Sequence, residues 1–376
     1  MQFEIPLLPI KKELETKLVL KQLAQTHRNL ALLNGKCDTI PNENILINTL
    51  SLQEAKESSA IENIITTHDE LYRAEISENI INNAATKEVS RYANALKNSF
   101  YKVRDTKIIT NRDIKNIQQE LVGNDAGYRR NIGTVLKNEK TNEIVYTPPQ
   151  DFDSIEKLMN NLIDFINDES LSDLDPIVKM AIIHHRFETI HPFYDGNGRT
   201  GRIINILYLV KEDLLELPIL YLSRYIIQYK KEYYQLLQDV REKENWESWI
   251  LFILKGVEET SKQTLYLIEG IQKLMLDYKH RIRKECKNIY SQDLINNLFK
   301  HPYTKIEFIE KDLGINRQTA SKYLKQLDNA GFLKKIKIGK SNYYINEPLY
   351  NLFLSGVPKA ETYDNIVTEH NIIYNH

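Results

Sequence analysis

Residues 191–202 read His-Pro-Phe-Tyr-Asp-Gly-Asn-Gly-Arg-Thr-Gly-Arg and combine the residue types that proton transfer and phosphate binding require. A histidine side chain ordinarily titrates near neutral pH, so His191 is predicted to accept a proton from a hydroxyl group. Asp195 offers the hard oxygen ligand that Mg²⁺ prefers. Arg199 and Arg202 stand three residues apart, so on a helix they share one face and suit phosphate oxygens. The stretch therefore predicts a site for a nucleoside phosphate.

Two helices are expected to position these side chains. Apolar residues recur at helical spacing before the stretch, as at Ile177 and Ile182, and after it, as at Ile203 and Leu207. Glycines on both sides of Asn197 free the backbone amides to converge at the start of the second helix. The helix dipole adds partial positive charge there, so the loop is a ready anion-binding site.

The twelve residues match, at every fixed position, the signature His-Pro-Phe-x-Asp/Glu-Gly-Asn-Gly-Arg-x-x-Arg of the Fic family of protein adenylyltransferases. The chain thus resembles an enzyme that transfers AMP from ATP to a Tyr, Thr or Ser hydroxyl of a target protein and of itself. Combined with the chemistry above, the resemblance makes His191 the base and Asp195 the ligand of Mg²⁺. The amides of residues 196–198, with Asn197, would steady the α-phosphate, Arg199 the β-phosphate and Arg202 the γ-phosphate.

A second motif precedes this one. Residues 51–67 predict a short helix ending near Asn63, and Ser58 to Asn63 fit the Ser/Thr-x-x-x-Glu-Gly/Asn pattern of self-inhibited Fic proteins. On its own, Glu62 would be an ordinary exposed acid. The resemblance instead implies an N-terminal inhibitory helix (about 51–65) whose Glu62 pairs with Arg202, while Arg199 serves catalysis alone. By their position relative to the motif, Tyr233, Leu237 and Arg241 are predicted to lie on the adenine side of the nucleotide. The other residues predicted to contact nucleotide are Glu62, Gly196, Asn197, Gly198, Arg199, Thr200, Gly201 and Arg202.

Residues 128–148 predict a β-hairpin within an otherwise helical region. Two apolar runs, 135–136 and 144–146, flank a polar turn, and Pro148-Pro149 ends the pattern. The hairpin is either a surface excursion or a flap whose edge strand holds a target peptide by main-chain pairing. The family has a flap at this place, which favours docking of the target hydroxyl there.

Composition predicts a mainly α-helical protein of several modules. The 376 residues include only 13 Gly and 11 Pro, and 3.6-residue periodicity dominates. Two cysteines fit a reducing, cytoplasmic location, and no apolar run is long enough to span a membrane. His184 and His185 are expected to pack or to form hydrogen bonds rather than bind metal, because adjacent helical residues point about 100° apart.

The expected fold is a Fic helical-bundle core with a flap, followed by a small winged helix-turn-helix domain. Predicted domains are an N-terminal helical module (1–100), the catalytic core (101–255), a linking helix (256–289), the winged module (290–347) and a tail (348–376). Single helices are predicted over 11–33 (ended by Asn34-Gly35), 86–104, 223–240 and 256–285.

The winged module suggests a nucleic-acid partner. Residues 281–343 hold fourteen Lys/Arg against six Asp/Glu, a net charge of +8. Residues 317–322 lie where a recognition helix would meet DNA. A docking or dimerisation role is equally open, as is a homodimer. Two alternatives to AMP transfer remain: a DNA-binding regulator or toxin-type protein that uses the core as a nucleotide-responsive switch, and an enzyme that transfers or removes another phosphate-containing group.

Overall fold

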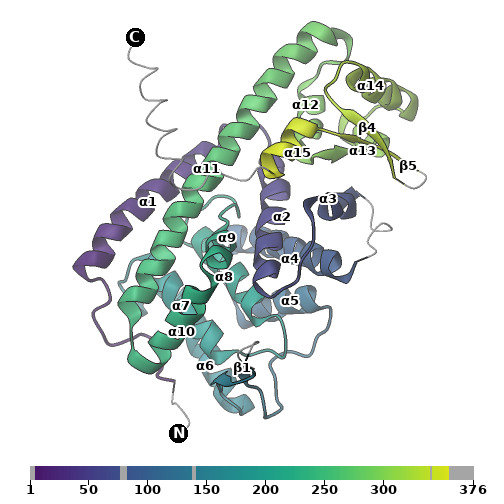
Figure 1. Ribbon diagram of the computed structural model, residues 1–376. Helices are drawn as coiled ribbons and strands as arrows, with labels where there is room; N and C mark the ends of the chain where they lie inside the picture. Colours follow the sequence, from purple (N-terminus) through teal and green to yellow (C-terminus); the bar gives the residue numbers. More distant parts are fainter. Residues whose placement is uncertain (1–4, 77–82, 138–140, 339–340, 355–376) are drawn as a thin grey trace, which may run out of the picture.

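The computed structural model describes residues 5–76, 83–137, 141–338 and 341–354 and is mainly helical, as predicted (Figure 1). The helices are α1 (Lys17–Cys37), α2 (Glu43–Ile61), α3 (His68–Ile76), α4 (Ala84–Thr106), α5 (Asn111–Val122), α6 (Phe152–Asn167), α7 (Pro176–Ile190), α8 (Asn197–Lys211), α9 (Leu222–Gln228), α10 (Lys230–Lys243), α11 (Trp246–Glu285), α12 (Gln292–Lys300), α13 (Ile306–Leu313), α14 (Arg317–Asn329) and α15 (Glu347–Leu354), with 3₁₀ turns at Glu169–Leu171 and Lys287–Ile289.

The helices α7 and α8 form the centre of the core and carry the loop 191–196 between them. Every residue of α7 from Ile177 to Ile190 is buried, as is almost all of α8. A helix that is buried all round must be covered by other elements. The neighbours α2, α4, α5, α6 and α11 provide this cover, so the loop between α7 and α8 is held by a fixed frame.

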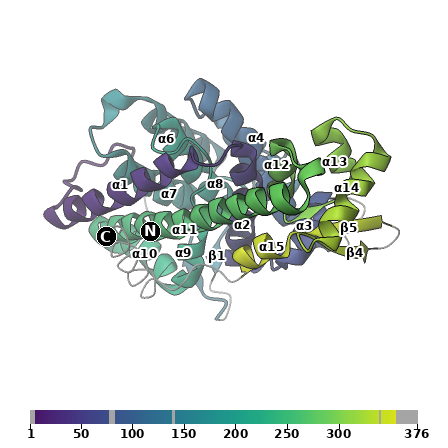
Figure 2. The ribbon, with the colours of Figure 1, turned by 90° about the horizontal axis from the view of Figure 1, so that it is seen from above.

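The start of α7 is fixed by Pro176 at the first turn and by the N-cap Asp175, whose carboxylate accepts from Ile177 N at 2.8 Å. The same carboxylate bonds His27 of α1 at 2.6 Å, which ties α1 to the central pair. Figure 1 and Figure 2 show α1 and the long α11 side by side along one flank of the core.

Three predicted helix assignments were wrong. The helix α1 continues through Asn34-Gly35 to Cys37, which is buried, so packing outweighs the roughly 1 kcal/mol helix cost of a glycine. The predicted helix 223–240 is two helices, α9 and α10, that meet at Tyr229, where φ is −113° and ψ is 34°. The ring of Tyr229 packs on that of Tyr225, 4.6 Å between centroids. Finally, α11 begins at Trp246 rather than at 256.

The flap hairpin is confirmed as a short antiparallel pair, β1 (Leu136–Lys137) and β2 (Ile144–Tyr146). Leu136 pairs with Tyr146 and Lys137 with Ile144. The predicted turn includes residues 138–140, which lie outside the described residues. Tyr146 donates its hydroxyl to Thr189 O at 3.0 Å, which anchors β2 beside the end of α7.

Residues 290–345 contain the three helices and the two-stranded wing that were predicted. Asn316 caps α14, and its side chain accepts from Thr319 N. The strands β4 (Lys334–Ile338) and β5 (Ser341–Ile345) are antiparallel. A third strand, β3 (Tyr303–Thr304), was not predicted; it pairs with β5, so the sheet order is β3-β5-β4.

The C-terminal elements rest against α2 and α3, as Figure 2 shows on the right. The helices α3 and α15 were both missed from the sequence, and their aromatic residues meet here. Tyr72 of α3 is buried among the rings of Tyr303, Tyr350 and Phe353, with centroids 6.0 to 6.3 Å away. Gln53 of α2 donates to the Tyr72 hydroxyl at 2.8 Å. Through Tyr72, α2 is thereby connected to the C-terminal domain.

None of the helices in the described ranges is both long and apolar enough to cross a membrane.

Candidate active site

His191 ends α7 in a left-handed conformation, with φ 49° and ψ 58°. Non-glycine residues rarely adopt this region, and here it turns the chain sharply from the helix into the loop. Burial lowers the pKa of His191 to about 4, and the nearby Arg129 and Arg241 guanidinium groups act in the same direction. The imidazole is therefore neutral at pH 7 and has a nitrogen available to accept a proton.

Arg129, which sequence reasoning missed, holds this turn from the flap side. It is fully buried, and its Nε donates to His191 O at 2.9 Å. Its Nη2 donates to Pro149 O, and its backbone N donates to Pro192 O at 2.8 Å. Arg129 lies at the start of the flap segment and Pro149 at its end. The Arg129 side chain thus ties this segment to the main-chain carbonyl of His191.

The loop after His191 is closed by Phe193 and Asn197. The Phe193 ring is fully buried against Tyr128. The Asn197 amide accepts from Phe193 N and donates to Phe193 O, both at 2.8 Å. Both polar ends of the Asn197 side chain are used by the loop. The Asn197 side chain therefore holds the loop, and its main-chain N–H lies at the helix start. That Asn197 steadies a phosphate stays a prediction.

The start of α8 is a helix N-terminus without a side-chain cap. Gly196 sits at the N-cap position with φ 77°, a conformation that suits glycine. Asp195, whose side chain is 64% exposed, accepts from Gly196 N at 2.6 Å. The first N–H groups of α8 and the helix dipole favour an anion at this place.

Arg202, 3% exposed, is bound to the end of α2 by three hydrogen bonds. Its Nη2 donates to Glu62 Oε1 at 2.7 Å and to Ser58 O at 3.0 Å, and its Nε donates to Ser58 Oγ at 2.7 Å. Burial works to lower the pKa of Arg202, but the negative charge of Glu62, together with Tyr233, Tyr92 and Glu188, outweighs it and holds this pKa above its usual value. The predicted Glu62–Arg202 pairing is present.

Asn63 explains why Glu62 stands at this point. Helix α2 ends at Ile61 with Glu62 as its C-cap, and Asn63 adopts the left-handed conformation with φ 62°. Backbone bonds from Asn63 N and Ile64 N close the helix end. Asn and Gly tolerate this conformation best, which accounts physically for the last position of the motif.

Arg199 is also paired with Glu62, which corrects the prediction that it serves catalysis alone. Its side chain is 2% exposed, and its Nε donates to Glu62 Oε2 at 3.1 Å. Its Nη1 donates to Glu88 Oε2 of α4 at 2.9 Å, and its Nη2 lies 3.6 Å from Asp195 Oδ1. Three carboxylates therefore surround the two guanidinium groups, and Glu62 bridges both.

Gly198 lies directly beneath this bridge. A Cβ atom added there would lie 2.5 Å from Glu62 Oε1 and 2.8 Å from Arg202 Nη1. Glycine at this position therefore lets the carboxylate approach the first turn of α8. Gly201, one turn on, allows α8 to approach α7, since its Cβ would meet Glu188 and Phe187 at 3.1 Å.

Glu188 is a buried acid of α7 that sequence reasoning missed. Burial raises its pKa to about 7, partly offset by the positive charge of Arg202. Its Oε1 has no hydrogen-bond partner within the described part of the chain. The sequence gives only a weak signal for Glu188 and Arg129. A charged residue in an apolar helix or in a loop does not by itself indicate which elements will bury it.

Two predicted adenine-side residues are committed elsewhere. Tyr233 is 1% exposed, and its hydroxyl bonds His184 Nε2 at 2.8 Å, so its ring belongs to the core. Arg241 lies over the Tyr146 ring at 4.0 Å and donates to Thr189 Oγ1 at 3.2 Å. Thr200 is fully buried. The main-chain carbonyl of Leu237 accepts a hydrogen bond from His185 Nε2 at 3.1 Å. None of the four presents a free polar group to solvent.

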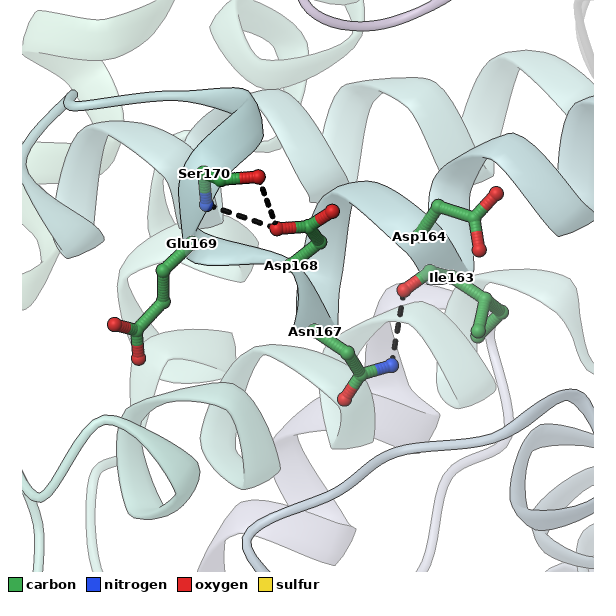
Figure 3. Close-up of a pocket in the computed structure, with 6 residues that line it drawn as sticks. All are labelled: Ile163, Asp164, Asn167, Asp168, Glu169 and Ser170. Carbon is green, nitrogen blue, oxygen red and sulfur yellow. Dashed lines mark hydrogen bonds between the residues drawn. The ribbon is translucent and has the colours of Figure 1, made fainter.

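A surface hollow of about 490 Å³ lies away from this site, at the end of α6. Figure 3 shows its lining, in which Asp168 accepts from Ser170 and Asn167 donates to Ile163 O. The remaining lining residues include the carboxylates Asp164 and Glu169. None of its lining residues is a histidine, lysine or arginine, whereas the loop 191–202 combines a histidine with two arginines.

Sequence profiles match three parts of the chain. The profile described as "Fic/DOC family" covers residues 108–209, and "Fic/DOC family N-terminal" covers residues 20–101. A third, "Protein adenylyltransferase SoFic-like, C-terminal domain", covers residues 274–349. The first contains the loop 191–202 and the second contains Glu62. The chain belongs to the Fic/DOC family.

Curated relatives match shorter segments of this Fic/DOC chain. Protein adenylyltransferase fic-1 of Caenorhabditis elegans is 42% identical over 53 residues, 14% of this chain and 10% of the relative. A probable protein adenylyltransferase of Aquifex aeolicus is 35% identical over 81 residues, 22% of this chain and 24% of the relative. Protein adenylyltransferase Fic of Nematostella vectensis is 27% identical over 167 residues, 42% of this chain and 34% of the relative. The chain thus matches between 10% and 34% of the length of these relatives.

Solved structures share the fold. A Fic family protein from Desulfovibrio desulfuricans G20 aligns with a TM-score of 0.55 and 18% identity, covering 91% of this chain and 98% of that one. Fic-1 of C. elegans (residues 134–508) aligns with a TM-score of 0.53 and 21% identity, covering 67% of this chain and 74% of that one. The Fic fold is therefore present over most of the chain.

Two serines of α2 allow the Arg202 contact to be tested without touching Glu62. Ser58→Ala removes the acceptor of the buried Arg202 Nε, so we expect a loss of about 1–3 kcal/mol in the free energy of unfolding. Urea unfolding measures this quantity. The matched control is Ser51→Ala: Ser51 is also fully buried on α2, and its hydroxyl has no partner in the described ranges, so its loss should be small. Equal losses for the two variants would contradict the assigned contact.

Proposed function

We propose that this Fic/DOC protein transfers AMP from ATP to the hydroxyl of a Tyr, Thr or Ser residue of a target protein, and to itself. The observation that carries the proposal is the juxtaposition of a neutral, half-buried His191 with an uncapped helix N-terminus followed by Arg199 and Arg202. That arrangement joins a proton acceptor to a triphosphate-binding surface. The names of the relatives, protein adenylyltransferases, point to the same reaction.

The reaction exchanges one bond for another at the α-phosphorus. The hydroxyl oxygen of the target forms a bond to this phosphorus, and the bond from the phosphorus to the bridging oxygen of the β-phosphate breaks. Pyrophosphate leaves, and the hydroxyl proton passes to His191. A neutral imidazole is required at the start, and the lowered pKa of His191 supplies it at pH 7.

The phosphates would be distributed along the first turn of α8. Main-chain N–H groups of residues 196–198 would stabilise the charge that develops on the α-phosphate. Arg199 would bind the β-phosphate and Arg202 the γ-phosphate, since both side chains project from the first two turns of α8 and planar guanidinium groups suit phosphate oxygens.

Asp195 fits a Mg²⁺ ion that arrives with the nucleotide. Its carboxylate is the most exposed acid of the loop, and only Oδ1 takes part in the contacts described, with Gly196 N and Arg199. Mg²⁺ commonly takes one or two protein carboxylates, with substrate phosphates and waters completing its shell. When bound, the ion would neutralise phosphate charge.

The target would dock on the flap. The strand β2 is held beside His191 by Tyr146, through Thr189 O and the Arg241 guanidinium, while Ile144 and Val145 are exposed. An exposed short strand can accept an extended segment by main-chain pairing. The anchoring of β2 would bring a hydroxyl on that segment to the base.

Glu62 would inhibit the reaction by occupying both arginines. Its carboxylate oxygens lie 3.1 Å from Arg199 Nε and 2.7 Å from Arg202 Nη2. A triphosphate needs the same guanidinium groups, so ATP would bind without its γ-phosphate on Arg202. Breaking one side of a buried pair costs roughly 3–5 kcal/mol, which is enough to bias the site strongly toward the inhibited state.

Glu62→Gly should therefore increase self-labelling. With ATP carrying a label on the α-phosphate, we expect at least about tenfold more label on the variant than on the wild type, the effect of roughly 1.4 kcal/mol. ATP labelled on the γ-phosphate is the control and should leave no label on protein. Equal labelling of wild type and variant would sink the inhibitory role, and an adduct whose mass is not that of AMP would favour transfer of another group.

His191→Ala in the Glu62→Gly background separates binding from chemistry. The imidazole is the proposed proton acceptor, so the label should disappear while Mg²⁺-ATP still binds by calorimetry. The reason is that the arginines and the start of α8 remain unchanged. Retained labelling would remove His191 from the chemistry.

We also propose that the C-terminal domain is a winged helix that binds DNA. The supporting observation is a row of exposed lysines: Lys322 and Lys325 on α14, with Lys335 and Lys337 on β4. Cations on a recognition helix and a wing suit the phosphates of a duplex. Docking or dimerisation through this domain is the alternative.

Lysine variants test this second function through its salt dependence. Replacing both Lys322 and Lys325 with Ala should reduce the slope of log K against log salt for duplex DNA by about 2, since each phosphate contact contributes about 1. Fluorescence anisotropy at several salt concentrations measures the slope. Lys17→Ala with Lys21→Ala on α1 is the control and should leave the slope unchanged. Absence of duplex binding by the full chain at low salt would exclude the DNA function.

A further inference from the structure

Glu88 is the contact of Arg199 that no motif in the sequence points to. It comes from α4, whereas Glu62 comes from the end of α2. Its Oε2 lies 2.9 Å from Arg199 Nη1, closer than Glu62 lies to Nε on the same guanidinium. The two carboxylates hold different edges of one planar group, so removing one does not remove the other.

The two carboxylates differ in what else they bind. Glu62 also pairs with Arg202, so any movement that clears the γ-phosphate position must withdraw Glu62. Within the described residues, Glu88 pairs with Arg199 alone among the cations. It is part of a 23-residue helix that packs on α8 directly, as well as on α2 and α5. Withdrawal of Glu62 therefore leaves Glu88 in place.

Arg199 needs such a partner. Its side chain is 2% exposed, and a buried guanidinium without a hydrogen-bonded counter-charge is costly. The guanidinium is planar, so a bond at Nη1 fixes the direction of the remaining donors. With Glu62 withdrawn, Nε becomes available to a phosphate oxygen while Glu88 keeps the plane from rotating.

We propose that Glu88 is a positioning residue for the transfer reaction, holding the Arg199 guanidinium toward the nucleotide once Glu62 leaves. The inference rests on the proposed function and deepens it. It separates two acids that contact the same arginine: Glu62 opposes the reaction and Glu88 supports it.

The test compares Glu62→Gly with the double variants that also carry Glu88→Ala or Glu88→Gln. Self-labelling at several ATP concentrations gives kcat and KM, and calorimetry gives the Kd of Mg²⁺-ATP. Because an arginine that is bound but misoriented fails chiefly in the transition state, Glu88→Ala should lower kcat about tenfold, equivalent to roughly 1.4 kcal/mol. The Kd should change less than about threefold. Glu88→Gln keeps an oxygen acceptor and should recover part of the loss.

The control is Glu43→Ala in the same background. Glu43 of α2 pairs with Arg104 of α4 at 3.1 Å, at the opposite end of α2 from Glu62. It should change neither kcat nor Kd. Thermal unfolding of each variant confirms that the fold is retained.

Three results would overturn the assignment. An unchanged kcat in Glu88→Ala would make Glu88 a bystander. Tighter ATP binding with unchanged kcat would show repulsion of phosphate instead of positioning. Increased labelling by Glu88→Ala with Glu62 intact would make it a second inhibitory acid. Failure of the proposed function itself looks different: Glu62→Gly would then bind Mg²⁺-ATP and yield no AMP on protein, and the role of Glu88 in transfer would fall with it.

Discussion

The bridge from one carboxylate of Glu62 to both Arg199 and Arg202 is the interaction on which the described state depends. It brings the end of α2 to the first turn of α8, and Gly198 leaves the space that it needs. The middle of α2 is fixed by a buried acid, Glu54, which accepts from the Tyr92 hydroxyl at 3.1 Å and from Ser223 N at 3.2 Å. Burial raises the pKa of Glu54 to about 7. The position of the Glu62 carboxylate at the end of α2 is thus fixed by a helix whose centre is hydrogen-bonded to α4 and α9.

The same helix connects the site with the rest of the molecule. One part of α2 contacts α8 and the arginines, while another packs on α12 of the C-terminal domain. The ring cluster around Tyr72 and the hydroxyl bond from Tyr303 to Asp69 join that domain to α3. On the far side of the loop, Arg129 and Tyr146 fasten the flap to the end of α7. The candidate base His191, the start of α8, the flap hairpin and Glu62 are therefore parts of one continuous packed frame.

Much of this could be predicted because the motif residues are constrained locally. The loop His191–Arg202 and the helix start at α8 follow from residue types with few alternatives in backbone or charge. The contact between Glu62 and Arg202 was predicted only from the resemblance to self-inhibited Fic proteins, because Glu62 on its own looks like an ordinary exposed acid. What could not be predicted depends on which distant elements cover a residue. Glu88 on a helix surface looks like any solvated acid, and Arg129 looks like a loop cation, until α8 and His191 are placed beside them. The enclosure of the Tyr233 ring by α7 and α11 could not be predicted for the same reason, and its place on the adenine side stays a prediction. Its burial reflects tertiary packing that periodicity does not encode.

The most direct measurement is a pair of crystal structures, wild type and Glu62→Gly, each with Mg²⁺ and a non-hydrolysable ATP analogue. Our account predicts that the wild type keeps the Glu62–Arg202 pair and that its γ-phosphate lies away from Arg202. In the variant the γ-phosphate should replace the carboxylate on Arg202, with Arg199 still bonded to Glu88. The same phosphate pose in both proteins, with Glu62 still paired in the wild type, would contradict the claim that this carboxylate and the triphosphate compete for one site.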